Sequence, residues 1–145
     1  MGKYERIIIP TDGSEENFKV ISEGLSLARM LGTNIKILFV VDTSSISGLP
    51  PDDMITRLEG QIRSKADELL KDIEEMAKNK GVGYSKSIKK GVPSDIIVSE
   101  AKEEDLIVMG HHTRTGLSRL LTGSTAQKVI REAECPVMVI RLEDD

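Results

Sequence analysis

The spacing of hydrophobic and polar residues along this chain alternates between two patterns. Short runs of apolar, mostly β-branched residues predict buried strands, and apolar residues three or four positions apart predict helices that pack on one side. The predicted strands are 7–9, which Pro10 ends, 35–41, 84–90, 106–109 and 137–140. The predicted helices are 18–31, which stops before Gly32, 53–80, 93–103 and 124–133. Each strand except the last is therefore followed by a helix.

This alternation predicts a doubly wound α/β fold with five parallel strands and helices on both faces of the sheet, because parallel strands need crossover connections. We expect residues 1–145 to form a single domain. Ligands of such sheets bind beyond the carboxyl ends of two neighbouring strands, where the winding reverses. The two turns with candidate ligand-binding residues follow the first and fourth predicted strands, so these strands should be neighbours. The strand order 3-2-1-4-5 satisfies this condition.

The segment from Gly110 to Thr125 gives the strongest indication of a binding site. It connects the predicted strand 106–109 to a helix, and it contains Gly123 just before that helix. Glycine leaves nearby backbone N–H groups unobstructed, and the first helical turn offers unpaired N–H donors at the positive end of the helix dipole. A phosphate group fits such a site. Ser124 is also explained as part of a capping box with Gln127, although a cap does not require Gly123.

These residues resemble the nucleotide loop of the universal stress protein family, G-x2-G-x9-G-[ST]. Gly110, Gly123 and Ser124 match this pattern, and Thr113 stands where the second glycine is expected. Residues 6–14 resemble the family's first strand and adenosine-contacting turn, and residues 135–141 resemble its last strand. The resemblance covers essentially the whole chain. It implies a Rossmann-like fold of the adenine nucleotide alpha hydrolase type with strand order 3-2-1-4-5.

The resemblance also implies an ATP site, with Mg or Mn bound through the phosphates. The residues that it assigns to the nucleotide are Pro10, Thr11, Asp12, Val40, Met109, Gly110, Thr113, Gly123, Ser124 and Thr125. The Asp12 carboxylate would accept a hydrogen bond from a ribose hydroxyl or the adenine amino group, and the Val40 backbone would contact the adenine edge. Both residues also have simpler explanations, since Asp12 or Ser14 is a suitable helix cap and Val40 an ordinary core residue.

Thr113 leaves two alternatives open. If the family's glycine is needed because the backbone has a positive φ or touches phosphate, a β-branched residue is strained there by about 1–3 kcal/mol, and ATP binds more weakly. Alternatively, the loop shifts, Thr113 contributes a hydroxyl group, and Gly116 supplies the flexibility. The sequence is compatible with both.

The amino-acid composition indicates which kinds of binding partner the protein is expected to lack. The chain has 20 Lys and Arg against 24 Asp and Glu, a formal charge of −4, and only two Tyr and two Phe. Without a basic block or interleaved aromatic residues, we expect no binding to nucleic acid. Cys135 is the only cysteine, which excludes an intrachain disulfide and a thiolate metal cluster. A charged start and no apolar run of membrane-spanning length predict a cytoplasmic protein without membrane contact.

These observations favour a stress-response or regulatory protein in which ATP acts as a switch. ATP hydrolysis would at most be slow, because His111 and His112 are adjacent loop residues without a partner motif, and no arginine finger or catalytic base is recognisable. The alternative is a nucleotide-free homodimeric interaction module of the same family, in which the loop is structural.

The last predicted strand indicates a homodimer. In the order 3-2-1-4-5 it lies at a sheet edge, yet it is continuously apolar and lacks the inward charge or proline that natural edges use against strand pairing. A second copy of the same strand would cover this edge across a two-fold axis, as the resemblance also implies. The strand residues at this contact are Val137, Met138, Val139 and Ile140.

Overall fold

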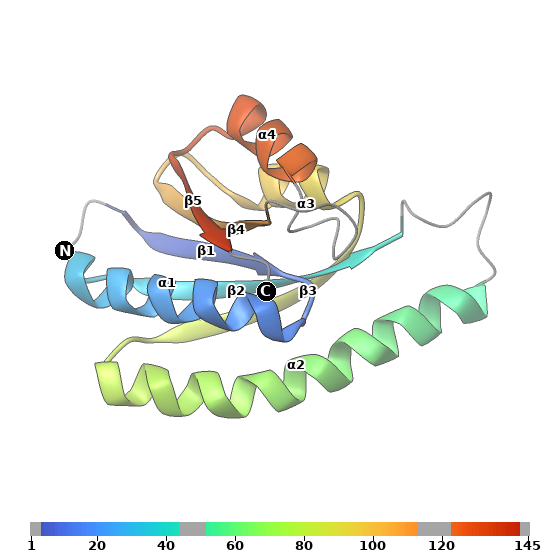
Figure 1. Ribbon diagram of the computed structural model, residues 1–145, viewed down its shortest axis with the longest axis horizontal. Coiled ribbons are helices and arrows are strands. Elements are labelled where there is room, and N and C mark those ends of the chain that lie inside the picture. Colours follow the sequence, from blue (N-terminus) through green and yellow to red (C-terminus); the bar gives the residue numbers. More distant parts are fainter. Residues whose placement is uncertain (1–3, 44–51, 113–122, 143–145) are drawn as a thin grey trace.

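A parallel five-stranded sheet with helices on both faces forms the centre of the protein (Figure 1). The structure is a computed structural model, and it describes residues 4–43, 52–112 and 123–142. The order of the strands is β3-β2-β1-β4-β5, and every neighbouring pair is parallel. Their bounds are β1 (Arg6–Thr11), β2 (Asn34–Asp42), β3 (Tyr84–Gly91), β4 (Asp105–His112) and β5 (Val137–Leu142). The predicted fold class and strand order are confirmed.

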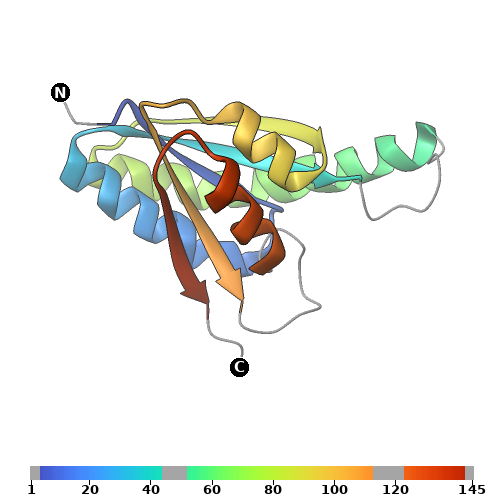
Figure 2. The same cartoon turned by 90° about the horizontal axis from the view of Figure 1, so that it is seen from above.

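Two helices cover each face of the sheet (Figure 1, Figure 2). On one face lie α1 (Phe18–Leu31), preceded by the short 3-10 helix η1 (Glu15–Asn17), and α2 (Asp52–Lys80), and on the other lie α3 (Pro93–Glu100) and α4 (Gly123–Glu132). Successive residues of β1 alternate between the two layers: Ile7 and Ile9 pack toward α1 and α2, and Ile8 packs toward α3 and α4. No helix in the described ranges is long and apolar enough to cross a membrane.

β1 continues through Pro10, so the prediction that this proline ends the strand is wrong. Pro10 is aligned with Leu38 of β2, and Thr11 with Phe39. The pairing of β1 with β4, in contrast, reaches only as far as Ile8. Proline has no N–H to donate, but at this position it removes no bond from the β4 ladder, which has already ended.

α3 ends at Glu100, three residues before the predicted end. The buried carboxylate of Asp105 binds the chain that follows the helix and so sets the start of β4. Asp105 is 2% exposed, and its Oδ2 accepts the backbone N–H of Lys102 at 2.8 Å. Its Oδ1 lies 3.1 Å from Nε of Arg6, whose Nη2 also donates to the carbonyl oxygen of Glu100. Ala101 is accordingly extended, with ψ of 133°. This ion pair joins the amino ends of β1 and β4.

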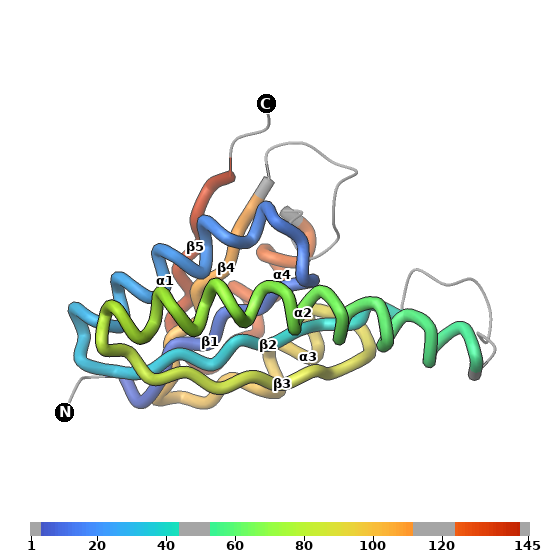
Figure 3. Tube along the Cα trace, turned by 90° about the horizontal axis from the view of Figure 1, so that it is seen from below, coloured from blue at the N-terminus to red at the C-terminus, as the bar shows by residue number. Residues whose placement is uncertain are grey.

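α2 lies over β2 and β3, and its first turns extend beyond the strands (Figure 3). Nζ of Lys90, near the end of β3, lies 2.7 Å from Oε1 of Glu59 on α2. This hydrogen bond, together with the charge of the lysine, holds the pKa of Glu59 below its ordinary value. The pair links α2 to the carboxyl end of the outer strand.

α1 approaches β1 closely because Gly24 has no side chain. A Cβ atom at this position would overlap Cδ1 of Ile9, which is fully buried in the layer beneath α1. Gly60, in the first half of α2, provides a contrast, because a Cβ atom there would meet nothing within 4 Å. The two helical glycines therefore differ in packing and share the same low helix propensity.

We expect Gly24→Ala to destabilise the protein, because overpacking costs about 1–3 kcal/mol and the gain in helix propensity offsets only part of it. The control Gly60→Ala should stabilise the protein by about 0.5–1 kcal/mol, since only the propensity changes. Urea unfolding followed by circular dichroism measures both. Ile9→Val removes Cδ1 and should relieve the overlap in the Gly24→Ala background. Equal free energies of unfolding for the two alanine variants would contradict the close approach.

Candidate functional site

β1 and β4 separate at the carboxyl end of the sheet. In the described residues their pairing ends at Ile8 and Ile107. Beyond this point β1 stays paired with β2 as far as Thr11, and β4 stays paired with β5 as far as His112. Figure 2 shows β4 and β5 diverging from β1 toward their ends. The sheet therefore opens between β1 and β4, where the direction of winding reverses.

The predicted site residues on the strands lie around this opening. Thr11 and Gly110 are each three residues beyond the last aligned pair, so the two strand ends face each other across it. Pro10 is buried, and Val40 and Met109 belong to the same core cluster, with exposed fractions of 2% and 0%. Val40 is thus the core residue that its apolar character suggests. These side chains belong to the core, and the polar contacts described next to them are those of the turn after β1.

The turn after β1 is held by hydrogen bonds centred on Asp12. Its Oδ1 accepts the backbone N–H of Ser14 at 2.9 Å and the side-chain Nδ2 of Asn17 at 3.1 Å. Oγ1 of Thr11, which is fully buried, accepts the N–H of Gly13 at 3.0 Å. Gly13 has φ of 85°, in the left-handed region that favours glycine. Asp12 therefore shapes the turn itself, and neither Ser14 nor Asn17 makes a side-chain cap bond to the helix that follows it.

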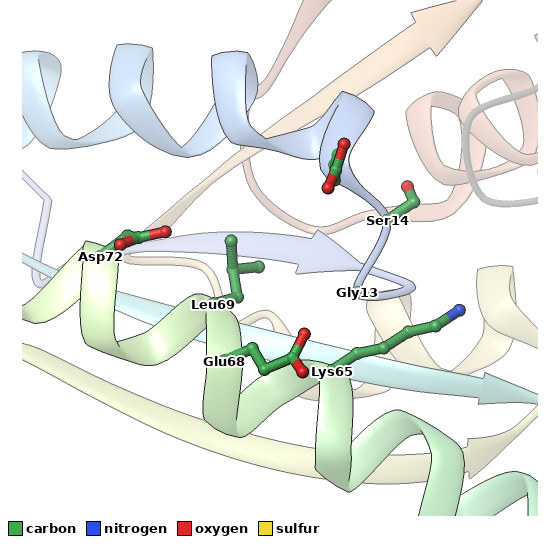
Figure 4. Close-up of a pocket in the computed structure, with 7 residues that line it drawn as sticks. Gly13, Ser14, Lys65, Glu68, Leu69 and Asp72 are labelled. Atoms are coloured by element: carbon green, nitrogen blue, oxygen red, sulfur yellow. The ribbon is translucent and has the colours of Figure 1, made fainter.

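A pocket of about 390 Å³ lies between this turn and α2 (Figure 4). It is lined by Gly13, Ser14, Glu15, Lys65, Glu68, Leu69 and Asp72. The side chain of Lys65 extends from α2 toward the turn in Figure 4, and its Cβ lies 3.1 Å from the position that a Cβ on Gly13 would take. Three carboxylates and one ammonium group surround the pocket, so its charge is unfavourable for phosphate.

The amino end of α4 lies at the same end of the sheet, after β4. The helix begins at Gly123, one residue earlier than predicted. Ser124 is exposed and Thr125 is 9% exposed. The N–H groups of this first turn and the helix dipole make the position electropositive. Thr113 and the other loop residues, 113–122, lie outside the described residues.

His111 and His112 belong to β4, so their prediction as loop residues is wrong. They are aligned with Arg141 and Leu142 of β5. Because of this pairing, β4 continues past Gly110. Nδ1 of His111 is buried and has no hydrogen-bond partner within the described part of the chain. Glycine and histidine are weak strand formers, so the apolar run ends at Met109, whereas the pairing with β5 does not.

Two residues of the site, Asn17 and Lys65, carry no signal in the sequence. Asn17 precedes the helical spacing that starts at Phe18, where a polar residue is typical of a solvent-exposed turn, yet its side chain is fully buried. Lys65 is one of many charged residues on α2, and only the packing of that helix brings it to Gly13.

Comparison with known proteins agrees with the motif pattern. The model of the family described as "Universal stress protein family" matches residues 3–141. The chain belongs to the universal stress protein family. A universal stress protein of Methanocaldococcus jannaschii is 36% identical to it over 140 residues, which cover 95% of this chain and 82% of that protein.

Solved universal stress proteins have the same fold. Universal stress protein UspA from Lactobacillus plantarum has a TM-score of 0.72 and 26% identity, covering 97% of this chain and 100% of that chain. A universal stress protein from Archaeoglobus fulgidus in complex with dAMP has a TM-score of 0.55 and 23% identity, covering 94% and 98%. Another, in complex with cAMP, has a TM-score of 0.66 and 19% identity, covering 95% and 97%.

The geometry of the Asp12 turn in this universal stress protein predicts the effect of a small change. Gly13→Ala should destabilise the protein by about 1–2 kcal/mol, because alanine is strained at positive φ. Contact with Lys65 should add to this cost. The control Gly32→Ala also has a positive φ, 66°, but nothing lies within 4 Å, so it should cost less. Thermal unfolding measures the difference. A smaller effect at Gly13 than at Gly32 would contradict the packing of the turn against α2.

Proposed function

We propose that this universal stress protein binds an adenine nucleotide, ATP, in the opening between β1 and β4, and that the bound nucleotide acts as a switch in a stress-response or regulatory role in the cytoplasm. The observation that carries the proposal is the placement of the Asp12 turn and the amino end of α4 at the same opening of the sheet. The Asp12 turn offers a carboxylate acceptor, and the amino end of α4 offers backbone N–H donors and the positive end of the helix dipole.

The charges of the described residues favour one orientation of the nucleotide. The pocket beside Asp12 has an excess of carboxylates, which repels phosphate, whereas the first turn of α4 attracts it. The adenosine would therefore lie against the Asp12 turn and the backbone of Val40, and the phosphates against Gly123, Ser124 and Thr125. When bound, Mg or Mn would neutralise the phosphate charge, and it would be held through the phosphates.

Two relatives support the ligand class. Two solved universal stress proteins are complexes, one with dAMP and one with cAMP. Both ligands contain an adenine base and a phosphate on the sugar. The two proteins share the fold with this chain over more than nine-tenths of both partners. An adenine nucleotide is therefore the ligand class to test first, and ATP is the form that the motif Gly110, Thr113, Gly123, Ser124 predicts.

A regulatory role agrees better with the site than a catalytic one does. Within the described residues, the carboxylate of the turn after β1, Asp12, takes part in the hydrogen bonds of its own turn. A base for phosphoryl transfer has to be free to orient the attacking nucleophile. We therefore expect at most slow hydrolysis. The alternative function is a nucleotide-free homodimeric interaction module, and a test of binding separates the two.

Isothermal titration calorimetry with ATP and magnesium should show one site per chain. Asp12→Ala should weaken binding about tenfold or more, because a hydrogen bond to a charged group is lost. Gly123→Val should abolish binding, because its side chain blocks phosphate from the backbone, while the circular dichroism spectrum stays unchanged. As a control, Asp67→Ala removes an exposed carboxylate of α2 that is paired with Lys86, and it should leave the affinity unchanged. No heat at millimolar ATP with folded protein would refute nucleotide binding and support the interaction module.

We further propose that the protein forms a homodimer through β5, because the two edges of the sheet differ in charge. The β3 edge carries Lys86, Lys89 and Lys90, which disfavour pairing with another strand. The β5 edge exposes Met138 and Val139, with exposed fractions of 42% and 36%. Ile130 of the adjacent α4 is 55% exposed and enlarges this apolar surface. Antiparallel pairing of two copies of β5 would cover it, with Val137 and Val139 packing across the axis and Met138 and Ile140 on the opposite face of the strand.

Light scattering after gel filtration should give twice the chain mass of 16.0 kDa for the unmodified protein. Val139→Lys should give the monomer, because it places two like charges near the axis and removes apolar contact. Tyr84→Lys on the β3 edge is a matched control, since Tyr84 is also 36% exposed, and it should remain dimeric. A monomeric unmodified protein at tens of micromolar would refute the dimer.

A further inference from the structure

Asn17 is a fully buried polar residue next to the proposed adenosine site. It is the last residue of η1, directly before α1, and its exposed fraction is 0%. Its side-chain Nδ2 donates to Oδ1 of Asp12 at 3.1 Å and to Oγ of Ser14 at 3.2 Å. Its backbone N–H donates to the carbonyl oxygen of Ser14 at 3.2 Å. Asn17 is thus bonded to both polar side chains of the turn that precedes it.

The carboxamide oxygen of Asn17 shows that stability alone does not account for an asparagine here. Oδ1 is buried and has no hydrogen-bond partner within residues 4–43, 52–112 and 123–142. Rotating the amide by 180° would give no improvement, because the oxygen would then face the Asp12 oxygen that Nδ2 now contacts. A buried acceptor without a partner destabilises a fold, whereas an apolar side chain of the same shape avoids this loss.

The contact with Asp12 restricts the rotation of its carboxylate. The terminal torsion of aspartate has a broad energy profile, so each further donor to Oδ1 narrows the range of orientations of the carboxylate plane. Ser14 N–H supplies one donor to Oδ1, and Asn17 supplies a second from the start of the helix. Because Asn17 is itself fully buried, its donor is held in place by packing.

We propose that Asn17 is a positioning residue for nucleotide recognition, which acts through Asp12 and sets the preference for ATP over analogues that lack the group bonded to Asp12. This inference rests on the proposed function, adenine-nucleotide binding at the opening. Asn17 does not touch the nucleotide, because its remaining polar atom, Oδ1, is buried. It orients the acceptor on which recognition depends.

The test variant is Asn17→Leu, which keeps the branched shape and removes both polar atoms. ATP affinity, measured by calorimetry with magnesium, should fall about tenfold, the effect of one well-oriented hydrogen bond to a charged group. Titrations with 2′-deoxy-ATP, 3′-deoxy-ATP and purine riboside triphosphate identify the group that Asp12 binds in the unmodified protein. For the analogue that lacks this group, the affinity should be the same in both proteins, so the preference for ATP disappears.

Stability and a second variant separate positioning from a structural role. The urea midpoint of Asn17→Leu should equal or exceed that of the unmodified protein, since an unsatisfied acceptor is removed. In an Asp12→Ala background, Asn17→Leu should cause no further loss of affinity, because nothing remains to be oriented. Asn34→Leu is a control at the opposite end of the sheet, where Asn34 accepts the N–H of Gly83, and it should leave ATP preference unchanged.

The outcomes distinguish this inference from the proposed function. If the unmodified protein binds no ATP, both are overturned. If it binds ATP and Asp12→Ala weakens binding, but Asn17→Leu leaves the preference for ATP intact, only the role of Asn17 is overturned. An equal loss for ATP and all analogues, with a lower urea midpoint, would make Asn17 structural and also overturn it. Asn17→Ala, which adds no bulk, is read by the same criteria if the leucine variant does not fold.

Discussion

The reversal of winding between β1 and β4 is the constraint on which the rest of the structure depends. Crossovers between parallel strands are right-handed, so a chain that moves outward from β1 to β3 and then returns to add β4 and β5 must place its helices on opposite faces of the sheet. No helix then bridges the carboxyl ends of β1 and β4. Once their pairing stops at Ile8 and Ile107, an opening remains there with strand ends on both sides.

The polar groups at this opening depend on one another. Thr11 and Asp12 give their oxygens to the backbone of the turn, and the left-handed Gly13 lets the chain reverse close to α2. Asn17 completes the set at the cost of a buried oxygen without a partner in the described chain. A turn selected only for stability would avoid this feature, because buried acceptors are normally satisfied. In the proposed function, a well-oriented carboxylate at the edge of the nucleotide site gives the feature a role.

The distribution of charge distinguishes the two edges of the sheet, and it also distinguishes the pocket beside α2 from the amino end of α4. The two sheet edges have the same backbone groups available for pairing, yet lysines follow the β3 edge, whereas β5 is apolar from Val137 to Ile140 and carries a single charge, Arg141, after them. Between the turn after β1 and α2, carboxylates surround a pocket, while the amino end of α4 has the positive end of a helix dipole. These differences place a second chain at β5 and phosphate at α4 in the proposed function.

The sequence by itself determined the alternation of strands and helices and the family, because hydrophobic period and glycine spacing are local properties of the chain. The strand order also followed from the sequence, since ligand-binding turns lie on neighbouring strands at the reversal of winding. Local pattern also placed Thr11 and Asp12 at the end of β1, and Gly110 near the end of β4. It failed where distant segments decide the outcome. The end of α3 depends on the burial of Asp105 against Arg6, and the length of β4 depends on pairing with β5. Only the tertiary structure buried Asn17 and brought Lys65 to Gly13, since burial and contact between distant residues arise from packing, which residue type and spacing do not encode.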